Sequence, residues 1–379
     1  MKFTINRNQF IRQISNVQRA ISTKSTIPIL TGMKLVLTTE GLTVTGSNVD
    51  LSIQTFIAQS DSDNELTIDS PGAIVLPARF FIEIIKKLPE NQFTFEILNN
   101  NQVLITSGIS KFTINGLDAA DYPHLPEVET SDQLKITAEI LKQLVSETVF
   151  AASTQETRPI LTGLHLKIKA EQLLAVATDS HRLAQRVVAI TNPNQNEFDL
   201  VVPAKSLMEL VRCFTENETE VTISISENQI LFEFGQTLFY SRLLEGNYPG
   251  TDRLIPQEST TQLEFEAKNL LESVERASLL SHASRNNVVR LEIDTANNKV
   301  TLTGNSPEVG TVAETMQPQA IKGDNLDISF NPDYLKDALN AFGETPISLE
   351  FTSALHPFTL KPTTDAESFI QLITPIRTF

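Results

Sequence analysis

Asp179, Ser180 and His181 are adjacent residues of the three types that form a hydrolase triad. In such a triad a carboxylate orients a histidine, and the histidine takes a proton from the serine hydroxyl. Three adjacent positions on one short stretch cannot supply this geometry by themselves, and the GxSxG sequence of a nucleophile elbow does not occur. The sequence therefore argues against nucleophilic catalysis here.

The other reactive residue types form no constellation that points to chemistry. The chain contains no GxxxxGK phosphate loop and no GxGxxG between a strand pattern and a helix pattern. Its 46 acidic residues give carboxylate pairs by chance, and none recurs at matching places. The histidines lack metal-ligand spacing: His124, His165, His181, His282 and His356. We expect no metal, no cofactor and no catalytic activity.

The elements that would position any site come as three versions of one unit. The segment TIPILTGMKLVL from Thr26 returns as ETRPILTGLHLKIK from Glu156 and as SRNNVVRLEID from Ser284. A second helix pattern opens at Ile74, Leu200 and Leu326, which are two equal intervals of 126 residues. A strand leading into a helix and a hairpin keep the same order in each unit. Such self-similarity indicates a repeated supersecondary unit.

Each unit combines short alternating strands with only two helices, which favours an α+β plan of antiparallel sheets covered on one face by helices. A doubly wound parallel fold would need a helix between most strands. Leu42 to Ile57 is expected as one strand. We place the three domains at residues 1–126, 127–256 and 257–379, with connectors that start at Asp118 and Glu245.

Composition is that of a folded protein without a membrane segment. Charged residues make up 20% of the chain and hydrophobic residues 40%. No apolar run reaches the roughly 18 residues of a membrane span, and no export signal pattern begins the chain. The lone Cys213 cannot form an internal disulfide, so we expect it in a helix core and the protein in a reducing cytoplasm.

The net charge of −16 is unevenly distributed. No Asp or Glu occurs in the first 39 residues, which carry six Lys and Arg. In the first helix pattern Phe10, Ile14 and Val17 share one face, whereas Arg12 and Arg19 lie opposite. An ordinary solvated helix face usually mixes both signs. This asymmetry therefore favours a surface that faces a polyanion.

Six short motifs occur in one order along essentially the whole chain. With them the chain resembles the bacterial DNA polymerase sliding clamp family, the beta subunit that is the processivity factor of the replicative DNA polymerase. The motifs are MKFTI at the amino terminus, Pro28-Ile29-Leu30, LPARFF from Leu76, ATDSHRLA from Ala177, Tyr248-Pro249, and Pro375 to Arg377.

The resemblance implies the DNA clamp fold, with two helices per domain lining the inside of a ring and antiparallel sheets outside. It implies a head-to-tail homodimer that encircles duplex DNA without sequence specificity. Its partners would be the replicative DNA polymerase catalytic subunit, the clamp loader, and other polymerases and repair proteins that dock through short peptides. Two other classes are weighed against it: a repeat-built hydrolase acting on a polymer, and a surface carbohydrate- or protein-binding module.

Three sets of site residues follow from the resemblance and the helix patterns. Lys24, Arg79 and Lys205 match family positions that contact DNA, and Arg158 lies in a comparable loop. The full set that we expect to face DNA is Arg12, Arg19, Lys24, Arg79, Lys86, Lys87, Arg158, Lys205, Arg212 and Arg276. For the dimer contact, the resemblance implies that Phe112 and Ile114 meet Leu279 and Leu280, although the two leucines could equally be core of their own helix.

The implied peptide-binding pocket combines residues of the second unit, its connector and the chain end. Leu161, Leu183 and Leu372 could each be plain core instead. Ser180 replaces a glycine of some relatives, and Thr374 and Ile376 stand where methionines can occur. The mapped residues are Leu161, Thr178, Ser180, His181, Arg182, Leu183, Pro249, Arg253, Leu254, Tyr334, Pro357, Leu372, Thr374, Pro375, Ile376 and Arg377.

Overall fold

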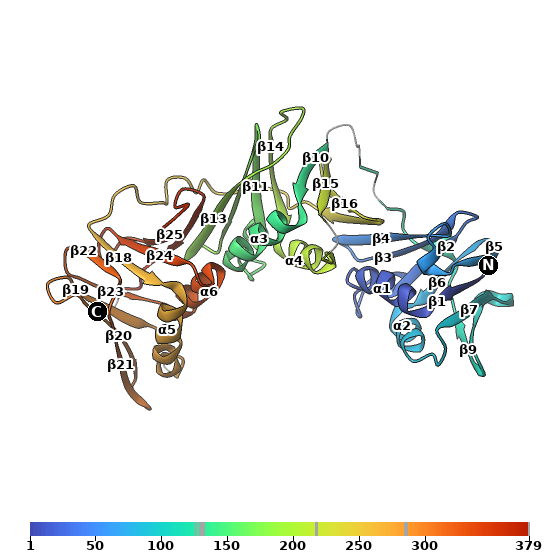
Figure 1. Ribbon diagram of the computed structural model, residues 1–379, viewed down its shortest axis with the longest axis horizontal. Coiled ribbons are helices and arrows are strands. Elements are labelled where there is room, and N and C mark those ends of the chain that lie inside the picture. Colours follow the sequence, from blue (N-terminus) through green and yellow to red (C-terminus); the bar gives the residue numbers. More distant parts are fainter. Residues whose placement is uncertain (126, 129–132, 217–218, 284–286, 378–379) are drawn as a thin grey trace. The chain divides into compact units, whose positions relative to one another are not determined.

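The computed structural model describes residues 1–125, 127–128, 133–216, 219–283 and 287–377, so the expected domain boundary at residue 126 lies outside the described residues. Figure 1 draws its helices and strands. The chain divides into two compact units. Unit 1 comprises Met1–Ala138 and Ser206–Leu243, and unit 2 comprises Glu139–Lys205 and Leu244–Phe379. Each unit therefore contains parts of more than one sequence repeat.

Unit 1 begins with a five-stranded sheet that ends in an unpaired edge strand. The strand order is β5 (Thr67–Ser70), β1 (Lys2–Asn6), β7 (Gln92–Ile97), β8 (Gln102–Ser107) and β9 (Ser110–Asn115). Helices α1 (Arg7–Gln18) and α2 (Ala78–Lys86) pack on it through Phe10 and Phe81, whose rings meet at 5.8 Å. The Asn6 side chain accepts hydrogen bonds from Asn8 N and Gln9 N and so caps the start of α1.

A second sheet in unit 1 joins strands from two repeats. Its order is β10 (Gln133–Thr137), β15 (Glu220–Ile225), β16 (Gln229–Phe234), β17 (Thr237–Arg242), β4 (Leu51–Ala58), β3 (Gly41–Ser47), β2 (Gly32–Leu37) and β6 (Gly72–Pro77). Strand β17 pairs with β4 in antiparallel register, with Phe239 opposite Ile53. The junction between these repeats is therefore a continuous hydrogen-bonded ladder.

Unit 2 contains the corresponding nine-stranded sheet. Its order is β14 (Phe198–Pro203), β11 (Gly163–Lys169), β12 (Gln172–Thr178), β13 (Arg182–Ala189), β26 (Phe369–Ile373), β25 (Phe358–Pro362), β24 (Pro346–Phe351), β18 (Thr261–Glu266) and β22 (Ala320–Gly323). Strand β13 pairs with β26, with Ala184 opposite Gln371. A second pair of repeats is thus joined by a ladder.

A four-stranded sheet completes unit 2, with edge strand β21 (Gly310–Met316) followed by β20 (Lys299–Ser306), β19 (Val289–Asp294) and β23 (Leu326–Phe330). Helices α5 (Ala267–Ser281) and α6 (Pro332–Phe342) pack in its core. The remaining helices are α3 (Ala138–Thr148), α4 (Ala204–Cys213) and the 3-10 turns at Pro28–Thr31, Ser62–Asn64, Asn99–Asn101, Ala119–Asp121, Val149–Ala151 and Pro159–Thr162.

The α+β plan with antiparallel sheets and two helices per repeat is confirmed, and Cys213 is buried in α4 as expected. The expectation of one strand over Leu42 to Ile57 is wrong. The chain turns between β3 and β4 because the Asn48 side chain accepts hydrogen bonds from Asp50 N and Leu51 N. Along the described residues, no helix is long and apolar enough to cross a membrane.

Candidate functional site

The clearest constellation in unit 2 lies where β13 pairs with β26. Val176, Leu183 and Leu372 form a small buried cluster on this sheet, and Leu174 packs against it half-buried. The turn from Thr178 to Arg182 leads into β13. The junction therefore combines a buried apolar cluster with polar groups beside it, the two kinds of side chain that occur together in ligand sites.

The turn before β13 is fixed by its own side chains. Asp179 Oδ1 accepts hydrogen bonds from His181 N at 2.9 Å and Arg182 N at 3.0 Å, and Thr178 Oγ1 donates to Arg182 O at 2.6 Å. Ser180 has φ 81°, in the region where a residue with a Cβ is strained. A glycine at this position would adopt the turn without that strain, which gives the departure noted at Ser180 a physical consequence.

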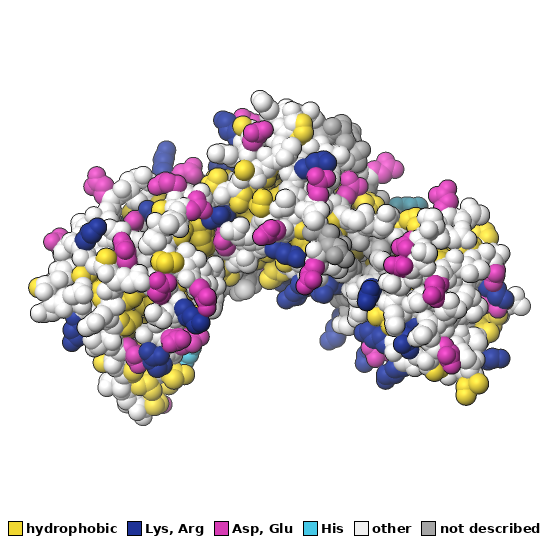
Figure 2. Space-filling view, in the orientation of Figure 1, with side chains coloured by type: hydrophobic (Ala, Val, Ile, Leu, Met, Phe, Trp, Pro, Cys, Tyr) yellow, Lys and Arg dark blue, Asp and Glu magenta, His cyan; other side chains and the backbone are white. Residues whose placement is uncertain are grey.

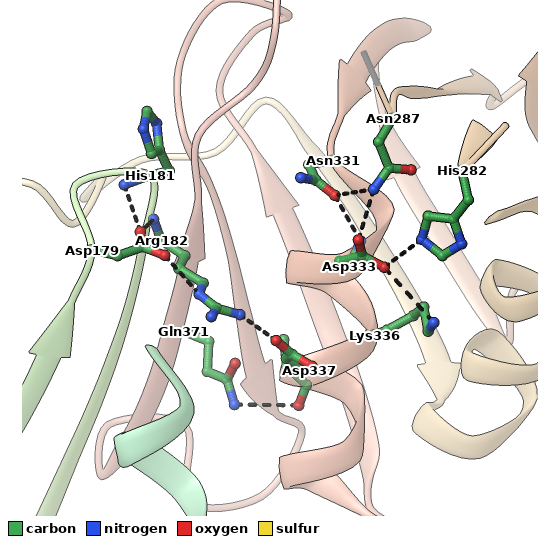
Figure 3. A network of polar contacts seen from close by, with 11 residues as sticks. Asp179, His181, Arg182, His282, Asn287, Asn331, Asp333, Lys336, Asp337 and Gln371 are labelled. Atoms are coloured by element: carbon green, nitrogen blue, oxygen red, sulfur yellow. Dashed lines mark hydrogen bonds and ion pairs between the residues drawn. The ribbon is translucent and has the colours of Figure 1, made fainter. Parts of the chain in front are cut away.

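Arg182 connects this turn to helix α6 (Figure 3). Its Nε donates to Asp179 Oδ2 at 3.0 Å, and its Nη1 donates to Asp337 Oδ2. The guanidinium also lies over the Tyr334 ring, 4.9 Å from its centroid. The side chain is only 13% exposed, so these contacts are largely shielded from water.

The same contacts exclude the hydrolase reading of Asp179, Ser180 and His181. The Asp179 carboxylate is bound by backbone amides and by Arg182, and the His181 ring lies parallel to that of Tyr334, with centroids 6.3 Å apart. Ser180 Oγ accepts a hydrogen bond from Arg158 Nη1 at 3.2 Å. These three side chains therefore form no relay from carboxylate through imidazole to hydroxyl.

Tyr248 supports the other side of the turn. Its hydroxyl accepts a hydrogen bond from Thr178 N at 3.1 Å, and its ring stacks on His165 at 4.5 Å between centroids. Burial raises the pKa of Tyr248 well above its ordinary value, and the Thr178 amide opposes the shift only in part. His165 Nε2 is 2.7 Å from Asp199 Oδ1. The Tyr248 phenol is thus a neutral structural anchor.

A second arginine links the two strands further along the ladder. Arg186 lies 3.3 Å from Glu147 and 3.2 Å from Asp365, and its guanidinium lies over Phe369 at 5.7 Å. Burial raises the pKa of Glu147, while Gln143 and Arg186 oppose that shift. This cation therefore partly offsets the cost of burying a carboxylate beside the ladder.

The chain end returns to the same site. Thr374 donates from its N and its Oγ1 to His181 O, at 2.9 Å and 2.8 Å, and Ile376 N donates to Ser329 O at 2.7 Å. Ile376 is nevertheless 36% exposed. The tail is therefore held by its backbone while an apolar side chain stays accessible.

The structure brings together half of the expected pocket residues through direct contacts. They are Thr178, Ser180, His181, Arg182, Leu183, Tyr334, Leu372 and Thr374. Leu161 is buried, Pro249, Arg253 and Leu254 are exposed on the connector, Pro357 precedes β25, and Pro375 and Arg377 lie in the tail. Sequence reasoning missed Val176, Leu174 and Asp337. The i, i+2 alternation with Thr178 could have identified the first two, whereas Asp337 gave no local signal.

The expected DNA-facing residues are all exposed. Figure 2 shows Lys and Arg side chains gathered where Figure 1 places α1 and α2 of unit 1. Arg19 and Arg212 share Glu209, Lys86 lies 3.8 Å from Glu83, and Arg276 forms a two-pronged pair with Glu314. Among the described residues, no ion-pair partner lies near Arg12, Lys24, Arg79, Lys87 or Lys205.

The expected dimer residues are accessible in the chain. Phe112 on β9 is 37% exposed and Leu279 on α5 is 71% exposed, while Ile114 and Leu280 are half-buried. Leu279 is therefore not core of its own helix. Strands β9 and β21 are both edge strands of their sheets.

Antiparallel ladders that join successive repeats, each with two helices, define a protein of the DNA clamp class. Family profiles described as the DNA polymerase III beta subunit match at residues 1–126 (N-terminal domain), 135–250 (central domain) and 252–377 (C-terminal domain). The chain belongs to this family, the beta sliding clamps, whose members are non-catalytic processivity subunits.

Individual relatives agree with this assignment. The chain is 45% identical to the beta sliding clamp of Bacillus subtilis, with 100% of each chain covered, and 45% identical to that of Streptococcus pneumoniae, with 99% of each covered. The crystal structure of the Bacillus subtilis clamp matches with a TM-score of 0.96 at 45% identity over 100% of both chains. A sliding clamp from Pseudomonas aeruginosa bound to griselimycin matches with a TM-score of 0.92 at 27% identity over 100% of both chains.

Replacing Arg182 tests how much its contacts contribute to the stability of the fold. Arg182→Met leaves Asp179 and Asp337 without their cation and removes the stacking on Tyr334. We expect the free energy of unfolding in urea to fall by about 2 kcal/mol, because Asp337 is partly solvated and the loss is smaller than for a fully buried pair. Arg253→Met, on the exposed connector, is the matched control and should change it by less than about 0.5 kcal/mol. Equal losses in both variants would contradict the assigned role.

Proposed function

We propose that two copies of this chain join head to tail into a ring that encircles duplex DNA without sequence specificity. The ring tethers the replicative DNA polymerase, the clamp loader and other replication and repair proteins through the pocket at the β13–β26 junction. Each chain contributes three domains, at residues 1–126, 127–256 and 257–379. The observation that carries the proposal is the repeated ladder between successive repeats.

Both internal junctions use equivalent strands in equivalent register. In each case the third strand of one repeat's meander, β4 of β2–β3–β4 or β13 of β11–β12–β13, pairs with a strand of the next repeat. That partner is the last strand of the next meander, β17 of β15–β16–β17 or β26 of β24–β25–β26. Phe239 lies opposite Ile53 at one junction and Gln371 lies opposite Ala184 at the other. Ile53 and Ala184 hold the same place in their sheets, opposite Gly46 and Ala177, which are themselves equivalent residues. The pairing is therefore set by backbone position more than by side-chain type.

The two remaining strands of this kind, β9 and β21, are edge strands. Unpaired edges present free N–H and C=O groups and favour association. By the same equivalence Phe112 of one chain would lie opposite Val312 of the other, and Thr113 opposite Thr311. This contact is heterologous, so it either closes or grows into a filament. Closure after two chains would give six domains, and it would bring Phe112 and Ile114 toward Leu279 and Leu280.

The helices give the ring a surface suited to nonspecific DNA contact. Arg12 and Arg79 are exposed cations on α1 and α2. Contacts of Lys and Arg with phosphates release counterions and read no base sequence. The paired arginines Arg19, Arg212 and Arg276 carry partly compensated charge, so binding would be weak. An encircling protein needs only weak contacts, because the closed ring supplies retention.

The pocket suits an extended peptide with apolar side chains. Val176, Leu183 and Leu372 supply an apolar floor, and the Arg182 and Thr374 contacts fix the rim. The structure of the relative from Pseudomonas aeruginosa contains bound griselimycin, so that relative accepts a ligand. We propose short peptides carrying a glutamine and hydrophobic residues as the partners of this site.

Retention on closed DNA tests encirclement directly. After loading by the clamp loader, we expect the protein to stay on a closed circular duplex when salt is raised and to be lost from a linear duplex of the same length. Electrostatic contacts alone weaken on both substrates alike. Linearising the circle with a nuclease should then release the protein, as measured by gel filtration. Equal loss from circular and linear DNA would rule out topological retention.

The strand register makes the dimer contact testable. A chain carrying Thr113→Cys and Thr311→Cys should form interchain disulfides on oxidation, because the proposed register places these residues opposite each other. Thr113→Cys with Thr315→Cys is the control and should remain unlinked.

In addition, Ile114→Asp should shift the protein to monomer in sedimentation, since it brings a charge into an apolar contact. A dimer unaffected by Ile114→Asp would contradict this interface.

The chain end tests the peptide pocket separately. Removing residues 376–379, of which 378–379 lie outside the described part of the chain, deletes the exposed Ile376 and Arg377. We expect binding of a glutamine-containing hydrophobic peptide, measured by fluorescence anisotropy, to be abolished, while sedimentation still reports a dimer. Removing only Phe379 serves as the control. Unchanged peptide affinity in the longer deletion would refute the pocket assignment.

A further inference from the structure

Each repeat has a cationic or imidazole side chain at one equivalent strand position. Lys34, His165 and Arg290 lie in the first strand of the repeated segment. They pair in register with Thr45, Val176 and Thr303, which are equivalent residues of the following strand. All three side chains therefore lie at the same place on their own sheets.

In the second and third repeats a carboxylate of the neighbouring strand partners this side chain. His165 Nε2 lies 2.7 Å from Asp199 Oδ1, and Arg290 Nε donates to Asp327 Oδ1 at 2.6 Å. Asp199 lies opposite Lys167, and Asp327 lies opposite Glu292. Since Lys167 and Glu292 each come two residues after His165 and Arg290, the two carboxylates occupy equivalent positions. The pair is therefore a repeated feature of the fold and uses the same two strand positions each time.

The first repeat keeps the cation and lacks the carboxylate. The residue equivalent to Asp199 and Asp327 is Ala73, which lies opposite Val36 in the register of β6 and β2. Ala73 is exposed. Among the described residues no carboxylate lies within ion-pair distance of Lys34. The amine instead lies over the Tyr122 ring, 5.7 Å from its centroid, as His165 stacks on Tyr248.

Lys34 borders an open recess of about 340 Å³. No Asp or Glu is among its lining residues, although acids outnumber bases in the chain by 46 to 30. Lys34 and His124 can therefore act on a ligand without a competing internal acid. The lining is Lys34, Val36, Thr43, Thr45, Gln54, Tyr122, Pro123, His124 and Leu125.

The recess differs in chemistry from the pocket of the second repeat. Thr43 and Thr45 stand where the second repeat has Leu174 and Val176, so hydroxyls replace the apolar floor. The Gln54 carbonyl accepts from Thr45 Oγ1 at 3.3 Å, which leaves its amide nitrogen as a donor toward the recess. Donors around one unpaired cation favour a polar, anionic group.

We propose that this recess binds a carboxylate of a partner polypeptide, an acidic side chain or a chain end, which takes the place that Asp199 and Asp327 fill in the other repeats. The proposal rests on the proposed function only in that a clamp docks polypeptides. It assigns a second docking point, on the first repeat, for partners whose binding segment is acidic.

The test uses the full-length protein with methyl-labelled valine and leucine and, as the probe, an N-acetylated hexaglutamate peptide. We expect the peptide to shift the methyl signals of Val36 and Leu125 in NMR titrations. Ala73→Asp restores the internal carboxylate and Lys34→Gln removes the cation, so each should raise the dissociation constant at this site at least fivefold. Thr67→Asp and Lys322→Gln make the same charge changes at exposed places elsewhere and should leave it unchanged.

Three results would overturn the proposal. One is hexaglutamate binding to Ala73→Asp or Lys34→Gln as it does to the unchanged chain. Another is equal binding of hexaglutamine, which would show that no carboxylate is recognised. The third is binding of free glutarate as tight as that of the peptide, which would indicate a small acid in place of a polypeptide.

The second pocket provides an independent readout. A glutamine-containing hydrophobic peptide should shift the methyl signals of Leu183 and Leu372. These shifts should be the same in the unchanged chain, in Ala73→Asp and in Lys34→Gln. If that peptide does not bind at all while hexaglutamate still shifts Val36, the proposed peptide pocket fails and the Lys34 recess stands. The reverse pattern would reject the recess and leave the pocket intact.

Discussion

Backbone hydrogen bonding between strands of successive repeats is the interaction on which the rest of this structure depends. The ladders β17–β4 and β26–β13 have equivalent registers although the paired side chains differ, Phe239 and Ile53 in one and Gln371 and Ala184 in the other. Since every residue supplies the same N–H and C=O groups, the repeats could diverge in sequence while their junctions kept one geometry. Hydrophobic cores inside each repeat stabilise the domains, but the ladders set how successive repeats connect within each unit.

The candidate site in unit 2 follows from this constraint. The Thr178–Arg182 turn immediately precedes β13, and the tail from Thr374 immediately follows β26, so pairing of the two strands brings both to the same edge. Arg182 then fixes the turn against α6 through Asp179 and Asp337. The candidate site is thus built at the same junction that joins two successive repeats. In the first repeat the equivalent positions hold Thr43 and Thr45 in place of Leu174 and Val176.

The exposed cations fall into two groups, those without an ion-pair partner and those paired with a carboxylate. The first 39 residues have no acid, and Arg12, Arg79 and Lys87 are exposed without ion pairs among the described residues. In contrast, Glu209 and Glu314 hold Arg19, Arg212 and Arg276. Carboxylates beside some of the cations reduce the attraction for a polyanion without removing it.

The sequence by itself determined the threefold repeat, the antiparallel α+β plan and the buried face of α1, with Phe10, Ile14 and Val17 inside. These features are local, because periodicity along a helix or strand states which side chains avoid water. It also argued against a hydrolase triad at Asp179 to His181, which the contacts of the three side chains then excluded. The expected equal spacing of the repeats was wrong by two residues, because the equivalent positions Ala73, Asp199 and Asp327 lie 126 and 128 residues apart. Where a local cue was overlooked, at the Asn48 turn, the expected strand was wrong. Only the tertiary structure decided that β17 pairs with β4, that Arg182 meets Asp337 and that Lys34 lacks the carboxylate found beside His165 and Arg290. These contacts join residues that are far apart in the sequence. Strand pairing uses backbone groups that every residue has, and the side-chain contacts depend on partners that the local sequence does not indicate.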